Sequence, residues 1–198
     1  MANSVFAGTS MSTARVEFME RTNLVPAEVI AGLNNMSKKL ADWTIYGTKV
    51  MGGATTKEMF EAKDTTRDSI TNLNNAKLEA GQYFLLEKIR VLSAQVDADT
   101  DEALASADFD IANSAILNGE LEIEVSGKTA LPRTSCRVFD KVAEAGDGLC
   151  GCYKLANPVM IAPQSLINAT IRINSAVASS LEKEAVRIEL IGCKVIPA

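Results

Sequence analysis

Apolar and polar residues alternate strictly in two segments of the last third of the chain. In residues 167–173, isoleucine or alanine fills every second position, with asparagine, threonine and arginine between them. In residues 186–190, valine, isoleucine and leucine alternate with arginine and glutamate. A period of two is typical of a half-buried antiparallel strand. We therefore expect two strands here, each with one face on a core and the other toward solvent or a neighbouring molecule.

Another alternation, in residues 120–131, predicts a β-hairpin. Glutamates alternate with apolar residues along its first strand, which reads Glu120, Leu121, Glu122, Ile123, Glu124 and Val125. The sequence Ser-Gly-Lys around Gly127 then supplies a turn into a second strand. The register is therefore specified on both sides of the turn.

A longer strand is expected in residues 81–96, but its apolar residues do not keep to one parity. Leu85 and Ile89 would lie on one face of a regular strand, and Phe84 and Leu86 on the other. Either both faces of this strand are covered, or a bulge exchanges them.

Three more elements are expected around these strands. Residues 97–111 are first acidic and then rich in alanine, which predicts a short helix with carboxylates at its positive end. A further strand is expected at residues 136–139. Residues 140–151 contain three glycines and predict a loop.

The first 80 residues carry weaker patterns. Residues 1–20 are rich in small polar residues and resemble an extended arm. One or two short helices are expected in residues 25–43, where Pro26 suits a first helical turn. Another short helix is expected at residues 55–61, and the polar stretch 64–75 resembles a linker.

These patterns divide the chain into three parts. Residues 1–60 form an amino-terminal arm with short helices, expected to contact neighbouring subunits. Residues 61–80 form a linker. Residues 81–198 form the β-rich domain, and a chain of 198 residues is long enough for one such core without needing two.

The composition narrows the class of protein. Hydrophobic residues make up 47% of the chain but aromatic residues only 5%, which predicts a core of aliphatic side chains. The net charge of −5 argues against direct binding of nucleic acid, which needs clustered lysine and arginine. No apolar run is long enough to span a membrane, and the four cysteines are expected to be reduced thiols.

Residue types that carry chemistry are scarce. The chain has no histidine, which excludes the usual catalytic triads and most zinc sites. Aspartates at 97, 99 and 101 have the spacing of a calcium loop, but Glu102 replaces its glycine. Cys150 and Cys152 lack the two intervening residues of a redox pair. The glutamates at 120, 122 and 124 fit a solvated outer face, or a face toward a basic partner, better than the acid pair of a glycosidase. We expect no enzyme activity, no catalytic, cofactor-binding or metal-binding residue and no small-molecule substrate.

Residues 81–198 resemble the jelly-roll virion proteins of bacteriophages. The resemblance rests on four segments, which are Gly-Gln-Tyr-Phe-Leu-Leu-Glu-Lys-Ile-Arg-Val at 81–91, Asn-Gly-Glu-Leu-Glu-Ile-Glu-Val-Ser-Gly-Lys at 118–128, Asn-Pro-Val-Met-Ile-Ala-Pro-Gln at 157–164 and Arg-Ile-Glu-Leu-Ile-Gly at 187–192. It implies a mainly β fold, an antiparallel β-sandwich of the jelly-roll type. Such jelly rolls usually have eight strands, of which five or six can be placed here.

The resemblance also implies a function. Subunits of that family assemble into or decorate a shell, so this chain would act in the virion, be made in the host cytoplasm, and contact copies of itself and other virion proteins. Candidate assembly contacts are Phe6, Val16, Phe18 and Trp43, since aromatic and apolar groups dominate interfaces. A lone tryptophan such as Trp43 is more often part of a local core than an anchor on a partner. The alternative function is a β-sandwich module that binds a receptor or a carbohydrate.

Overall fold

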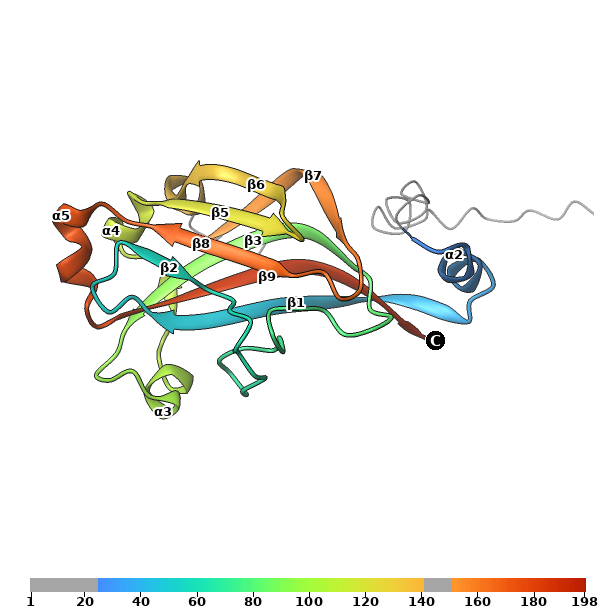
Figure 1. The fold of residues 1–198 in the computed structure, drawn as a ribbon, viewed down its shortest axis with the longest axis horizontal. Helices are drawn as coiled ribbons and strands as arrows, with labels where there is room; N and C mark the ends of the chain where they lie inside the picture. Colours follow the sequence, from blue (N-terminus) through green and yellow to red (C-terminus); the bar gives the residue numbers. More distant parts are fainter. Residues whose placement is uncertain (1–24, 141–150) are drawn as a thin grey trace, which may run out of the picture.

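Two antiparallel β-sheets pack face to face in the computed structural model of the protein, which describes residues 25–140 and 151–198 (Figure 1). The first sheet contains β1 (Lys38–Val50), β3 (Phe84–Gln95), β4 (Asp110–Ile111), β7 (Cys152–Ile161) and β9 (Glu184–Pro197). The second contains β2 (Thr56–Glu58), β5 (Glu120–Val125), β6 (Lys128–Ser135) and β8 (Ile167–Arg172). This confirms a mainly β fold, an antiparallel β-sandwich with short helices.

The strand pairs are nested along the chain. β1 pairs with β9, β2 with β8, β3 with β7, and β5 with β6, so early strands meet late ones and the innermost pair is a hairpin. Successive pairs fall into alternate sheets. Within the sheets, β3 also pairs with β9, and β5 with β8. The chain is thus arranged as one long antiparallel ribbon wound into two four-strand layers, with the two-residue β4 added beside β3.

The core lies between the inner faces of the two sheets. Its fully buried side chains include Phe84, Ile89 and Leu190 of the first sheet and Leu121 and Ile171 of the second. The alternation in residues 167–173 is confirmed, since the apolar members of β8 are buried. The predicted hairpin is confirmed too, because β5 and β6 flank a tight turn with positive φ at both central residues.

Both explanations for the mixed pattern of residues 81–96 are correct. β3 lies inside its sheet and its register shifts between Leu86 and Lys88, which is a β-bulge. Its outer face is also covered, since Leu85 is buried against Val29 of α2 (Ala27–Asn34) and Cys193 of β9. The bulge and the covering explain why neither parity is purely apolar.

Short helices close the ends of the sandwich. α2 covers one end of the outer face of the first sheet through Val29 and Leu33. α3 (Asp101–Ala105) covers the other end through Leu104, and its amino terminus is capped by the Thr100 hydroxyl, which confirms the helix expected in residues 97–111. The remaining helices are α4 (Ser114–Leu117), α5 (Ser175–Ala178) and the 3₁₀ turns η1 (Cys136–Phe139) and η2 (Ser179–Leu181). None of the helices in the described part of the chain is long and apolar enough to cross a bilayer.

Three secondary-structure predictions are wrong. The helical expectation for residues 25–43 holds for α2 only, since β1 begins at Lys38 and pairs with β9 along its whole length. Residues 55–61 form no helix, because Thr56–Glu58 pair with β8 instead. In both places, pairing with a distant strand overrides the local pattern.

The strand expected at residues 136–139 is a 3₁₀ turn. The Ser135 hydroxyl accepts a hydrogen bond from the Arg137 N–H, which caps the turn. Cys136 and Phe139 are both fully buried, and residues three apart face the same side of a 3₁₀ helix. The apolar spacing of this segment therefore has a helical period.

Residues 38–80 belong to the β-sandwich, although the sequence prediction placed them in an arm and a linker. β1 and β2 are strands of the two sheets. The expected linker, residues 61–80, contributes Ile70, Leu73 and Leu78 to buried clusters. The domain therefore begins well before residue 81.

Candidate functional site

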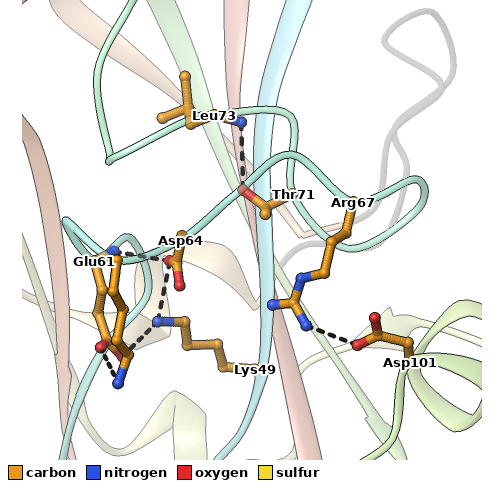
Figure 2. A network of polar contacts seen from close by, with 8 residues as sticks. Lys49, Glu61, Asp64, Arg67, Thr71, Leu73 and Asp101 are labelled. Atoms are coloured by element: carbon orange, nitrogen blue, oxygen red, sulfur yellow. Dashed lines mark hydrogen bonds and ion pairs between the residues drawn. The ribbon is translucent and has the colours of Figure 1, made fainter.

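A network of charged groups holds the segment after β2 against the end of β1 (Figure 2). The Lys49 ammonium donates to Glu61 Oε1 at 2.5 Å and lies 3.2 Å from Asp64 Oδ2. The Glu61 backbone N–H donates to Asp64 Oδ2 at 2.8 Å. Only 13% of the Lys49 side chain and 8% of the Asp64 side chain are exposed, so each charge is satisfied by a partner inside the chain.

The electrostatics of this network oppose proton transfer at neutral pH. Hydrogen bonds from Lys49 and from the exposed Lys63 lower the pKa of Glu61 to about 2. The contact with Glu61 in turn raises the pKa of Lys63. Glu61 is therefore fully ionised at pH 7 and cannot serve as a general acid. The arrangement fits a clamp between loop and sheet better than a catalytic centre.

A second contact extends the clamp to α3. Arg67 Nη1 donates to Asp101 Oδ1 at 2.7 Å (Figure 2). The Arg67 backbone N–H donates to the Thr71 carbonyl at 2.9 Å. The Leu73 N–H donates to the Thr71 hydroxyl at 3.4 Å. A hollow of about 320 Å³ lies between these groups and is lined by residues of both charges, among them Lys49, Lys57, Arg67, Asp99 and Asp101.

Arg187 of β9 forms another link across the outer face of the first sheet. Its guanidinium stacks over the Tyr46 ring at 4.3 Å and donates to Glu189 Oε1 at 2.8 Å. It also donates to the Ser69 carbonyl at 2.8 Å. These contacts join β9, β1 and the segment of residues 61–80. Two charged groups therefore hold this segment to the first sheet, the Lys49 ammonium and the Arg187 guanidinium.

The outer face of the second sheet is polar along β5. Glu122 pairs with Arg172 at 2.7 Å, and Glu120 pairs with Arg133. Glu124 lies on the same face, next to the hairpin turn. The three glutamates of β5 are thus on an outer face, two of them neutralised by arginines from neighbouring strands, and do not form an acid pair across a cleft.

Of the four candidate assembly residues, only Trp43 lies in the part of the chain that the structure describes. Trp43 lies in β1, half-buried, with its ring packed edge-on against Phe84 at 5.6 Å and the Lys194 ammonium 4.1 Å from its centre. It contributes to the rim of the core, and its role in assembly stays a prediction. Phe6, Val16 and Phe18 lie outside the described residues.

Several other thiols and carboxylates that could serve in catalysis or metal binding are buried or paired within the chain. Cys136 and Cys193 are buried free thiols, and burial raises the pKa of each to about 12. Asp101 is paired with Arg67, and residues 25–140 and 151–198 contain no group of three or more cysteine, aspartate or glutamate side chains able to hold a metal ion. The carboxylate of Glu184, only 2% exposed, accepts a hydrogen bond from the Ser93 hydroxyl at 2.5 Å.

Sequence reasoning missed the residues that build the clamp. Lys49, Glu61 and Asp64 come from a strand and a loop that the pattern assigned to separate parts of the chain. Asn72 was also missed, although its amide bonds to the edge of β1 at Tyr46 and Thr44. The only local signal was the density of Asp, Asn and Thr in residues 64–75, which is typical of side chains that bond to backbone.

Comparison with known proteins adds no family to this description. No protein-family model and no curated protein matches the chain. The class of the protein is therefore defined by its fold, an antiparallel β-sandwich with nested strand pairs, whose described charged clusters are engaged in contacts within the chain.

Proposed function

We propose that the protein is a virion structural protein of the jelly-roll type, a capsid or capsid-associated subunit that acts by repeated contacts with its own copies and with other virion proteins. The nested pairing of β1 with β9, β2 with β8, β3 with β7 and β5 with β6 carries this proposal. Nested pairing of this kind is expected of a jelly roll, an architecture used by viral capsid and lectin domains, and it therefore supports the proposal. The site of action would be the virion, after synthesis in the host cytoplasm.

The side-chain contacts support assembly over the alternative of a carbohydrate-binding module. Sugar sites use aromatic rings as open platforms, whereas three partly exposed rings among the described residues are occupied by other side chains. Tyr46 is covered by Arg187, Trp43 by Lys194, and Tyr153 packs against Phe139. The polar outer face of the second sheet, where Glu120 and Glu122 are paired with arginines, suits contact with another folded surface more than enclosure of a small ligand.

Light scattering across a concentration series, with negative-stain images of the same samples, tests the proposal. Closed particles, rings or regular sheets are the expected result. A strict monomer at every concentration, together with hits on a glycan array, would refute self-assembly in favour of the binding module.

A deletion of residues 1–20 serves as the paired variant. It leaves every described strand intact, so its circular dichroism spectrum should match that of the full chain. We expect it to lose assembly. A truncated protein that assembles normally would contradict the assignment of inter-subunit contacts to Phe6, Val16 and Phe18.

A further inference from the structure

The free edge of β1 is covered along only half of its length. The Tyr46 N–H donates to Asn72 Oδ1 at 3.0 Å, and the Asn72 side-chain amide donates to the Thr44 carbonyl at 2.7 Å. The Thr48 N–H donates to the Ile70 carbonyl at 2.9 Å. Residues 44–48 are therefore closed to any further strand.

The other half, Lys38–Asp42, presents open backbone groups. β1 pairs with β9 without a register shift, so its residues alternate between the β9 side and the free side throughout. Because Thr44, Tyr46 and Thr48 bond on the free side, the N–H and C=O groups of Lys38, Leu40 and Asp42 point there too. None of the described residues pairs with them on this side.

Other sheet edges carry features that oppose strand addition. β6 contains Pro132 and β7 contains Pro158, neither of which can donate to a ladder. β2 is only three residues long. The Lys38–Asp42 edge is not short and contains no proline. Its charged side chains oppose pairing except with a strand that places opposite charges beside them.

We infer that the Lys38–Asp42 edge of β1 pairs antiparallel with the same edge of a second copy, about a two-fold axis at Leu40. In this register each Lys38 lies opposite Asp42 of the second copy, and the two Leu40 residues face each other. Three hydrogen-bonded residue pairs then give about six backbone hydrogen bonds. The first sheets of the two copies become one continuous sheet, an isologous contact.

Charge complementarity fixes this register. Neither Lys38 nor Asp42 has an ion-pair partner among residues 25–140 and 151–198, although both lie at the open edge. Antiparallel pairing centred on Leu40 places opposite charges beside each other twice, whereas a shift by two residues separates them. The Asn72 cover limits the ladder, because it blocks β1 from Thr44 onward. The inference rests on the proposed function, for which it names one contact.

Charge exchange in the full-length protein tests the pairing. K38D and D42K each replace two attractive cross-strand pairs by two repulsive ones, so sedimentation equilibrium should show a dimer dissociation constant about tenfold higher for each. The double variant K38D/D42K restores opposite charges and should return within about threefold of the unchanged protein. D68K, a matched reversal of an exposed aspartate away from this edge, should have no effect.

A crosslink provides a second measurement, since the Lys38 stem packs against Gly32 and K38D could disturb α2. Hydrogen-bonded residue pairs have Cα atoms about 5.5 Å apart, within disulfide range. Mild oxidation of L40C should therefore join two copies through position 40, as identified by mass spectrometry of the linked peptide.

The outcomes separate this contact from the proposed function. A double variant as weak as the single ones, or no link through position 40 in a self-associating sample, would overturn the edge pairing. Closed particles formed equally by all variants would overturn it and leave the proposed function standing. A charge-dependent dimer that never grows larger would support the edge pairing and contradict the shell function. A strict monomer would overturn the edge pairing, and it would overturn the proposed function as well only if the protein also bound glycans on the array.

Discussion

Replacing Gly192 with alanine tests the close approach of the two central strands of the first sheet. Gly192 lies in β9 opposite Leu86, beside the bulge of β3. A Cβ atom on Gly192 would lie 1.8 Å from the Leu85 carbonyl oxygen and 2.9 Å from its carbon. Cβ contacts under 3.0 Å essentially never occur, so β3 and β9 would have to separate by roughly 1 Å.

The expected cost follows from this separation. Overpacking in a tight core costs about 1–3 kcal/mol. Loss of two neighbouring ladder hydrogen bonds adds about 1 kcal/mol each. We expect G192A to lower the free energy of unfolding by about 3–5 kcal/mol, which for a chain of this size lowers Tm by about 6–20 °C.

Urea and thermal unfolding followed by circular dichroism measure the effect. Gly127 provides the control, because its φ of +74° strains an alanine but nothing lies within 4 Å of an added Cβ. G127A should therefore lose only about 1 kcal/mol. A G192A protein as stable as G127A would refute the claim that the β3–β9 spacing depends on glycine.

Three further predictions concern acid, thiols and the covered strand edge. Glu61 has a pKa of about 2 in the folded protein against an ordinary 4.5, so its ion pairs stabilise the protein above pH 4.5, by about 1 kcal/mol after solvent screening, and this contribution is lost as the pH falls toward 2. In urea unfolding, E61Q but not E58Q should therefore reduce the dependence of the free energy of unfolding on pH over that range. The same pH dependence in both variants would contradict this. Burial raises the pKa of Cys136 and of Cys193 to about 12, so both thiols should react slowly with a disulfide reagent in the folded protein at pH 8 and rapidly in urea. Peptide mapping identifies the labelled thiols, and rapid labelling of either one in the folded protein would contradict its burial. N72A should cost about 1–2 kcal/mol and increase self-association in sedimentation velocity, because it uncovers the middle of β1, and an unchanged sedimentation profile would count against that role.

Strong local periodicity predicted the strands whose two faces differ most. β5 buries Leu121 and Ile123 and leaves its glutamates partly exposed, and β8 buries every apolar residue of its alternation. The mixed pattern of β3 indicated either a bulge or two covered faces, and the structure has both. In β5 and β8 the side-chain alternation indicates the core face, so the sequence carries that information locally.

β1 and the charged clamp could not be found in this way. β1 contains the consecutive residues Trp43, Thr44, Ile45 and Tyr46, whose pattern is blurred because Asn72 and Arg187 cover its edge and outer face. Its partner β9 is more than a hundred residues away in sequence. The Lys49–Glu61 ion pair likewise depends on where the segment after β2 lies, and the pairing of β2 with β8 that places it is specified by no local pattern.

The nested order of the strands also constrains when the protein can fold. β9 follows every other described strand along the chain, yet it lies between β1 and β3 in the first sheet. Until β9 is synthesised, β1 has no partner in its sheet and the outer pair of the ribbon cannot close. Such long-range pairing predicts slow folding that is completed only after translation has passed residue 197. A nascent chain therefore exposes the edges of β1 and β3 that later receive β9, and these edges stay open to other chains until β9 arrives.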